Sequence, residues 1–256
     1  MSIRLDQIVN MPAFSPYYAN PPARYRNVKF QFVDFRADVS AVGRVLPECF
    51  EPDEDGYCVA IGLTVPWSDN YGPFEESVLV VGCRFEGQPG FFAPIAFLNS
   101  TNSIPAGREI YGTPKVSADI TVSMDDQQMV TDTRQGGTSI FRVRTTMRDA
   151  ATADEFPDLT PSWRLKVIPR ADGPGAAVCQ LIDATPVTQD VTVHVRRKGE
   201  GVVEFSPDPV PPSRKPGELP FCDLSDFTPR EYLGAGYLEM DYTEGYGEIV
   251  RDFLAG

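Results

Sequence analysis

The sequence predicts a mostly β protein: an antiparallel sheet closed into a cone-shaped barrel, with a few short helices around it. Three observations support this. About ten stretches are rich in β-branched and aromatic residues, and nearly all are bounded by Gly, Pro or Asp. Gly (21) and Pro (24) are frequent in the 256 residues, which suits short strands joined by turns. Closure is expected because it removes exposed sheet edges.

The first expected strand is the aromatic segment KFQFVDFRAD (29–38). A short amphipathic helix follows, because apolar residues recur with helical spacing until Pro47 stops the pattern. Three consecutive strands are then expected at 57–65, 76–85 and 91–98.

After a turn at 107–115, six further strands are expected in VSADITVSM, TSIFRVRTTM, WRLKVIP, AAVCQLIDA, VTVHV and GVVEF. The tail GYGEIVRDFL (245–254) has apolar residues in helix-like positions, which predicts a C-terminal helix. No linker or internal repeat divides the chain, so we expect a single domain over 1–256. The proline-rich stretch 206–220 is interpreted as an ordered surface excursion.

Composition limits the partners. The net charge of −13 disfavours nucleic acid, because an acidic surface repels phosphate. No apolar run approaches the ~20 residues of a membrane-spanning helix. Five cysteines without a Cys-x-x-Cys motif, and no secretion signal at the N-terminus, predict reduced thiols in a cytoplasmic protein.

Most catalytic motifs are missing. His194 is the one histidine, which excludes metal sites that need two or more, and we interpret it as structural. The acidic cluster at 51–55 lacks calcium-loop spacing and is interpreted as a solvated loop. There is no nucleotide-binding glycine motif and no nucleophile elbow. We therefore expect chemistry without metal or cofactor, or none.

A lysine imine is one such chemistry, because its cationic nitrogen draws electrons from a neighbouring bond. A lysine with the reference pKa of about 10.4 is almost wholly protonated at pH 7, so an imine-forming lysine needs an apolar site. Of the five lysines, Lys115 follows a proline-fixed turn directly behind an aromatic residue, Tyr111. On residue grounds alone, an ordinary ion-paired lysine remains the alternative.

Four segments of the chain form a recognisable series. In chain order they are NVKFQFVDFRADVSAVGRVLPECFEPD (27–53), EESVLVVGC (75–83), GREIYGTPKVSA (107–118) and WRLKVIPRADGPGAAVCQLIDATPVTQDVTVH (163–194). Together they resemble the acetoacetate decarboxylase family. The resemblance covers most of 25–205. It implies a cone-shaped antiparallel barrel, usually oligomeric, so a homo-oligomer is expected.

The resemblance also implies site residues. Lys115 would be the Schiff-base nucleophile, and Glu76 the carboxyl group that positions substrate or moves protons. Arg108 would bind a substrate carboxylate or form a structural ion pair. The chain departs from the family pattern at three places: Val116 replaces a second lysine, Val28 an arginine on the first strand, and Ile61 or Ala60 a second glutamate.

These departures leave the lysine in place but alter its surroundings. We expect a lyase acting on a small oxo acid through Lys115, favouring aldolase-dehydratase chemistry with a pyruvate-like donor. The alternative is decarboxylation of acetoacetate or a bulkier β-keto acid through the same imine. A second alternative, from another class, is a non-catalytic binder of an apolar carbonyl ligand.

Overall fold

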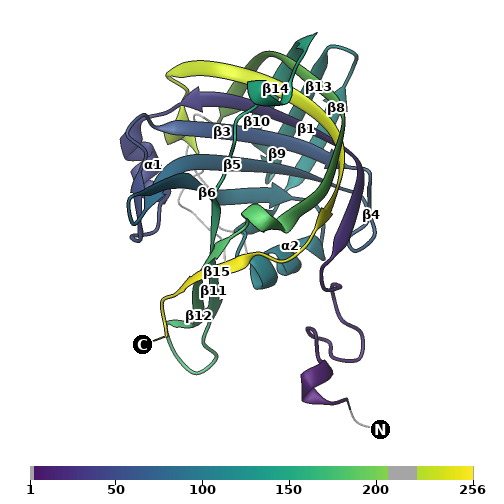
Figure 1. Cartoon of the computed structure of the whole chain (residues 1–256), viewed down its shortest axis with the longest axis vertical. Helices are drawn as coiled ribbons and strands as arrows, with labels where there is room; N and C mark the ends of the chain where they lie inside the picture. The colour runs from purple at the N-terminus through teal and green to yellow at the C-terminus, as the bar shows by residue number, and fades with distance from the viewer. Residues whose placement is uncertain (1–2, 207–223, 256) are drawn as a thin grey trace.

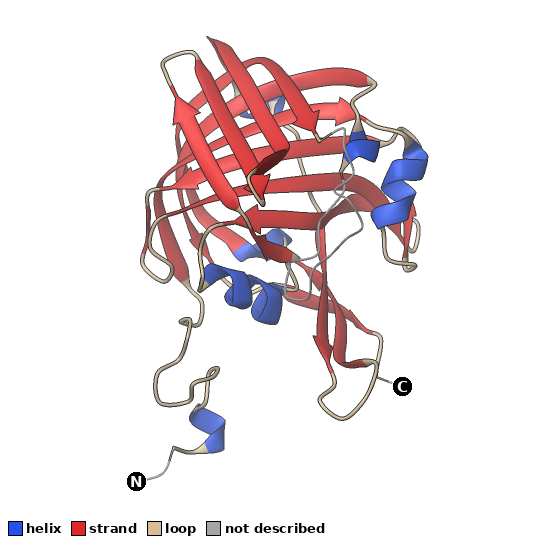
Figure 2. Cartoon of the chain, turned by 180° about the vertical axis from the view of Figure 1, so that it is seen from behind, coloured by secondary structure: helices blue, strands red, loops and turns tan. Residues whose placement is uncertain are grey.

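The computed structural model describes residues 3–206 and 224–255 (Figure 1). The proline-rich stretch interpreted as a surface excursion lies, apart from its first residue, outside the described residues. Strands dominate, as predicted, and the helices are short pieces at the margins of the sheet (Figure 2). The helical segments are η1 (Leu5–Gln7), α1 (Val39–Val45), α2 (Ser103–Ala106), η2 (Gly107–Tyr111), η3 (Ala153–Glu155), η4 (Thr185–Val187) and η5 (Ser225–Phe227).

The described strands form one 15-stranded sheet. Its members are β1 (Ala23–Arg36), β2 (Phe50–Pro52), β3 (Tyr57–Val65), β4 (Trp67–Ser68), β5 (Phe74–Phe85), β6 (Gln88–Leu98), β7 (Lys115–Ser117), β8 (Asp119–Met124), β9 (Gln128–Gln135), β10 (Thr138–Ala150), β11 (Ser162–Pro169), β12 (Ala176–Asp183), β13 (Thr188–Phe205), β14 (Glu231–Glu244) and β15 (Glu248–Asp252).

The hydrogen-bonded order is β15-β12-β11-β6-β5-β3-β1-β14-β13-β10-β9-β8. Most pairings are antiparallel, as predicted, but β6 pairs with β7 and with β11 in parallel, so the sheet is mixed. The sheet curves until β5 contacts β8 and β3 contacts β9 (Figure 1). The predicted closure therefore takes the form of packing between one end of the sheet and its middle.

The predicted helix after residue 38 is confirmed as α1. The Asp38 carboxylate caps its first turn by accepting a hydrogen bond of 2.8 Å from the backbone N–H of Ser40. The predicted C-terminal helix is wrong, because this segment forms β15 against β12, where Ile182 faces Ile249. Ile249 remains 61% exposed, so this apolar residue does not pack into the core.

The sheet packs against two separate apolar clusters. Val33 and Phe35 of β1 point into the main core, which lies between β3, β5 and β6 on one side and β10 and β13 on the other. A second apolar cluster, which includes Tyr25, Phe74 and Ala106, lies where α2 approaches β1 and β5. Phe74 of this second cluster lies beside Lys115, whose amine is placed over its ring.

Asp34 on β1 is a titratable group held mostly out of water. Burial raises the pKa of its carboxyl to about 7, against a hydrogen bond from Tyr57 that lowers it. Its Oδ1 atom has no hydrogen-bond partner within the described part of the chain. Folding therefore favours the protonated acid.

Asp34→Asn should change how stability depends on pH. A folded pKa above the unfolded value of about 4 means that stability is lost as pH rises from about 4 to about 7. The free energy of unfolding of the variant, minus that of the wild type, should rise by up to about 4 kcal/mol over this range and then level off. Urea titrations of both proteins at several pH values measure it. A difference independent of pH would contradict the assignment.

Candidate active site

The segment before Lys115 is a tight connection. α2 continues into the single π-helical turn η2, and Gly112 ends it at a φ of 74°, a left-handed conformation that glycine adopts without strain. A Cβ atom at Gly112 would also lie 2.5 Å from the backbone nitrogen of Lys166 on β11. Pro114 follows, and Lys115 opens β7 beside Ala96 of β6. The position of the lysine is thus fixed by backbone on both sides.

The amine of Lys115 is held by two polar groups among apolar side chains. Nζ donates a hydrogen bond of 3.0 Å to Ser103 Oγ and lies 3.7 Å from Glu76 Oε2. The side chains of Lys115 and Glu76 are each 12% exposed. Nζ is also 6.0 Å from the centre of the Phe74 ring, within the range of a cation–π contact. The lysine is therefore mostly withdrawn from water.

Gly107 leaves the space that this side chain occupies. A Cβ atom built on Gly107 would lie 2.4 Å from Cδ and 2.7 Å from Cε of Lys115. Only a residue without a side chain permits the lysine to extend along η2. The first glycine of GREIYGTPK is thereby explained by close packing, not by backbone conformation.

Glu76 reaches the lysine from β5. Phe74 and Glu76 are two residues apart on one strand, so their side chains emerge on the same face. The partners opposite Glu76 are Leu63 on β3 and Leu98 on β6. The two residues assigned to the site by resemblance, Lys115 and Glu76, are thus brought together from positions 39 residues apart.

Arg108, the third candidate, lies elsewhere. It is exposed, and its Nη1 donates a hydrogen bond of 3.2 Å to the backbone oxygen of Lys115. This contact fits the structural alternative, with a backbone carbonyl in place of an ion pair. Binding of a substrate carboxylate by Arg108 stays a prediction.

The family's other polar positions are apolar in the structure. Val28 is fully buried and belongs to the second cluster, while Val116 packs against the main core. Ile61 is 6% exposed and Ala60 is fully buried. The neighbourhood of Lys115 therefore lacks a second lysine, a first-strand arginine and a second glutamate at these positions.

Two charged residues that sequence reasoning missed lie near this pair. Glu244, at the end of β14, accepts a hydrogen bond of 2.6 Å from the Tyr25 hydroxyl. Burial raises the pKa of Glu244, as does the charge of Glu76, whereas Lys115, the Tyr25 bond and Arg164 lower it. No motif in the tail signalled this residue.

Arg164 on β11 is the other missed residue. Its Nη1 donates hydrogen bonds of 2.8 Å to Ser162 Oγ and of 2.8 Å to the Trp163 carbonyl oxygen. Burial lowers the pKa of Arg164 to about 10, and the charges of Glu76, Asp183 and Glu244 oppose that shift. In the sequence, Arg164 belongs to the expected strand WRLKVIP. The alternation of residues along that strand does not indicate which of its two faces lies toward Lys115 and Glu76.

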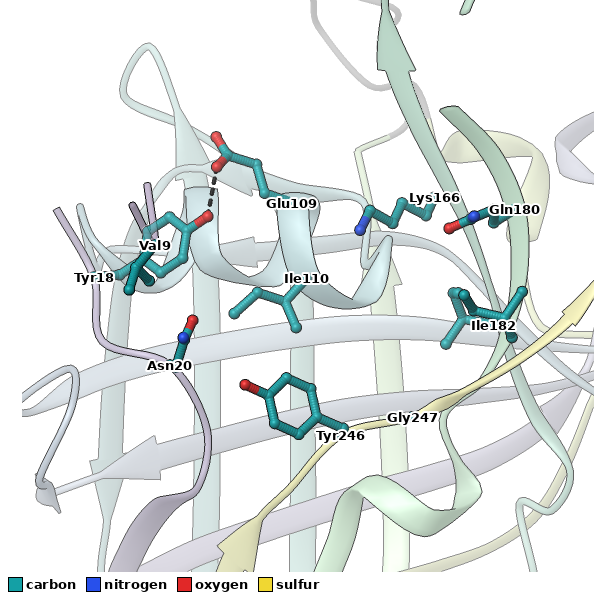
Figure 3. A pocket seen from close by; sticks show the side chains of 11 residues that line it. Val9, Tyr18, Asn20, Glu109, Ile110, Lys166, Gln180, Ile182, Tyr246 and Gly247 are labelled. Atoms are coloured by element: carbon teal, nitrogen blue, oxygen red, sulfur yellow. Dashed lines mark hydrogen bonds between the residues drawn. The ribbon is translucent and has the colours of Figure 1, made fainter. Parts of the chain in front are cut away.

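A pocket of about 330 Å³ adjoins η2 on another side (Figure 3). Glu109 and Ile110 of η2 line it, together with Tyr18 from the N-terminal arm and Lys166 from β11. The Tyr18 hydroxyl donates a hydrogen bond of 2.5 Å to Glu109, which ties the arm to the turn. Lys115 does not line this pocket.

Within residues 3–206 and 224–255, no group of three or more His, Cys, Asp or Glu side chains is placed to hold a metal ion. His194 lies 3.4 Å from Asp241, an exposed contact between β13 and β14. None of the helices in these two ranges is long and apolar enough to cross a membrane.

The chain is similar to proteins of one known family. The sequence model of the acetoacetate decarboxylase (ADC) family matches residues 10–254. Proteins named acetoacetate decarboxylase from Acidiphilium cryptum and Burkholderia mallei are each 28% identical to this chain over 253 residues, covering 96% of it and 95% of the relative.

Solved structures show the same fold. Acetoacetate decarboxylase from Legionella pneumophila superposes with a TM-score of 0.82 at 24% identity, covering 98% of this chain and 96% of its own. The enduracididine biosynthesis enzyme MppR, solved with the condensation product of pyruvate and imidazole 4-carboxaldehyde, superposes with a TM-score of 0.78 at 20% identity, covering 96% and 97%.

Tyr111→Phe should test how the turn is anchored. The Tyr111 hydroxyl donates a buried hydrogen bond of 2.8 Å to the Gly245 carbonyl oxygen, which joins η2 to the residue after Glu244. Its loss leaves a buried acceptor unpaired, so the free energy of unfolding should fall by about 1–3 kcal/mol. Denaturant titration measures this, with exposed Tyr17→Phe as the control. Equal stability of the two variants would contradict the anchoring role.

Proposed function

We propose that this chain, which belongs to the acetoacetate decarboxylase family, is a lyase that joins Lys115 to the carbonyl carbon of a small oxo acid as an imine. The observation that carries the proposal is the environment of one amine. Nζ lies 3.0 Å from Ser103 Oγ and 3.7 Å from Glu76 Oε2, and the side chain is 12% exposed. A mostly desolvated amine beside a carboxylate has both a nucleophile and a proton acceptor.

The first step is imine formation. The amine lone pair adds to the carbonyl carbon, the amine loses a proton, and the former carbonyl oxygen takes up protons and leaves as water. Glu76 is the group placed to carry these protons, since its carboxylate is the one within 4 Å of Nζ in the described chain. Ser103 orients the amine by accepting its hydrogen bond.

We favour condensation for the next step. Glu76 removes a proton from the carbon beside the iminium carbon, which gives an enamine. The enamine carbon bonds to the carbonyl carbon of an aldehyde, whose oxygen takes up a proton and becomes a hydroxyl group. The former enamine carbon then loses a second proton, the hydroxyl group takes up a proton and leaves as water, and a carbon–carbon double bond forms. Hydrolysis releases an unsaturated oxo acid and restores Lys115. The apolar side chains of Val28 and Val116, in place of the family's cations, support a reaction other than acetoacetate decarboxylation.

Decarboxylation is the second candidate, favoured by the names of the relatives at 28% identity. With a β-keto acid, the bond to the carboxylate carbon breaks, carbon dioxide leaves, and the electron pair forms an enamine without a carboxylate. Protonation and hydrolysis then give a ketone. Both candidates use the same lysine and the same carboxyl group.

Borohydride trapping tests the imine. Wild-type protein incubated with pyruvate or acetoacetate and then reduced should gain the mass of one reduced adduct, and peptide mapping should place it on Lys115. Lys115→Ala should gain none, whereas Lys198→Ala, which removes an exposed lysine, should behave as wild type. Absence of an adduct with every oxo acid tried would sink the proposal. Ligand binding that survives Lys115→Ala would then favour the non-catalytic binder.

Product analysis separates the two reactions. Carbon dioxide release from a panel of β-keto acids would establish decarboxylation. Condensation predicts instead an unsaturated product, seen by ultraviolet absorbance and mass, only when pyruvate and an aldehyde are both present. If β-keto acids lose carbon dioxide and no condensation product forms, our preference is wrong while the imine stands.

Gly107→Ala should disable the lysine without unfolding the protein. The new methyl group would overlap Cδ and Cε of Lys115, so the side chain must rotate away from Glu76. We expect adduct formation at a rate at least about tenfold lower, as for other displaced catalytic groups. Gly43→Ala is the matched control, since its nearest neighbour, Pro52 Cγ, is 3.8 Å away. Equal trapping rates in the two variants would contradict the packing argument.

A further inference from the structure

Arg164 faces the same side of the sheet as the reacting pair. Trp163, its neighbour on β11, points into the main core, so alternation sends Arg164 to the opposite face. The backbone of Leu165 and Lys166 lies against Gly112, three residues before Lys115. β11 therefore runs directly beside the turn that delivers the nucleophile.

The guanidinium has an unused edge. Nη1 is engaged by Ser162 and by the carbonyl oxygen of Trp163. Nε is buried and has no hydrogen-bond partner among the residues described. Across that same part of the chain, no carboxylate lies within 4.0 Å of Arg164. Arg36, Arg134 and Arg251, by contrast, each form an ion pair with a carboxylate. The Nε–Nη2 edge thus carries two parallel donors without a protein acceptor.

A buried donor without an acceptor is costly, and a ligand that accepts a hydrogen bond from Nε of Arg164 would remove that cost. The Nε–Nη2 edge of a guanidinium matches the two oxygens of a carboxylate. The site also needs such a cation, because Glu76 and Glu244 both act electrostatically on Arg164 and would repel an incoming acid. Arg108, by contrast, is exposed and donates a hydrogen bond to the backbone of Lys115.

We propose that Arg164 binds the carboxylate of the substrate, and that the substrate is therefore an oxo acid whose carboxylate docks on the Nε–Nη2 edge while its carbonyl carbon meets Lys115. This inference rests on the proposed imine function. It places the substrate carboxylate on β11, a strand that lies outside the sequence segments around Lys115 and Glu76.

The test compares an acid with its neutral analogue. Pyruvate and methyl pyruvate present the same carbonyl group, but only pyruvate carries a carboxylate. For each variant, the concentration that gives half-maximal borohydride trapping on Lys115 is measured for both compounds. Arg164→Met removes the guanidinium at similar length, and Arg164→Lys keeps the charge without the fork. Arg170→Met, at an exposed site on the adjoining loop, is the control.

Arg164→Met should raise the half-maximal concentration of pyruvate about 10- to 100-fold, the effect of losing a charge-assisted bidentate contact. Methyl pyruvate should change by less than about threefold, Arg164→Lys should be intermediate, and Arg170→Met should match wild type. An unchanged pyruvate value, or equal weakening of both compounds, would overturn the inference. If Arg164→Met does not fold, a wild-type ratio of the two concentrations in Arg164→Lys would overturn it.

The outcome for wild type separates this inference from the proposed function. If wild-type protein traps neither compound, imine chemistry itself fails. If wild type traps both and the Arg164 variants retain the wild-type preference, only the assignment of Arg164 fails.

Discussion

The site depends on one constraint: a lysine amine must stay mostly out of water beside a carboxylate. Water would keep the amine charged and unreactive, and an unpaired ammonium in an apolar site would be unstable. The side chain of Lys115 is 12% exposed, which limits its contact with water, and the 3.7 Å contact with Glu76 and the hydrogen bond to Ser103 give the amine polar partners. Gly107 and Gly112 serve the same end, because side chains there would collide with the lysine or with β11.

Polar groups around this pair are distributed differently from the pattern that the family resemblance implies. The positions of the second lysine and the first-strand arginine hold buried or packed valines, Val116 and Val28. Charge enters instead from β11 and β14, through Arg164 and Glu244. We propose that these differences leave Lys115 as the nucleophile and change which acid fits the site. The role of the lysine and the identity of the substrate are therefore separate questions.

Local residue patterns predicted most of the strands. The resemblance of four segments to the acetoacetate decarboxylase family singled out Lys115 and Glu76. Prediction from the sequence failed where long-range pairing decides. Residues 245–254 have helix-like apolar spacing, yet β12 provides a strand partner for residues 248–252. Arg164 and Glu244 could not be recognised, since only the fold brings both side chains within electrostatic reach of Glu76. Arg108 was a candidate through the family resemblance, whereas its side chain donates a hydrogen bond to the backbone oxygen of Lys115.

The most direct test of the central claim is a crystal structure of the protein after reduction with borohydride in the presence of pyruvate. We predict continuous density from Lys115 Nζ to the central carbon of the adduct, with its methyl carbon facing Glu76 and its carboxylate on the Nε–Nη2 edge of Arg164. An adduct on another lysine, or an unmodified Lys115 beside bound pyruvate, would contradict the claim that this amine is the nucleophile.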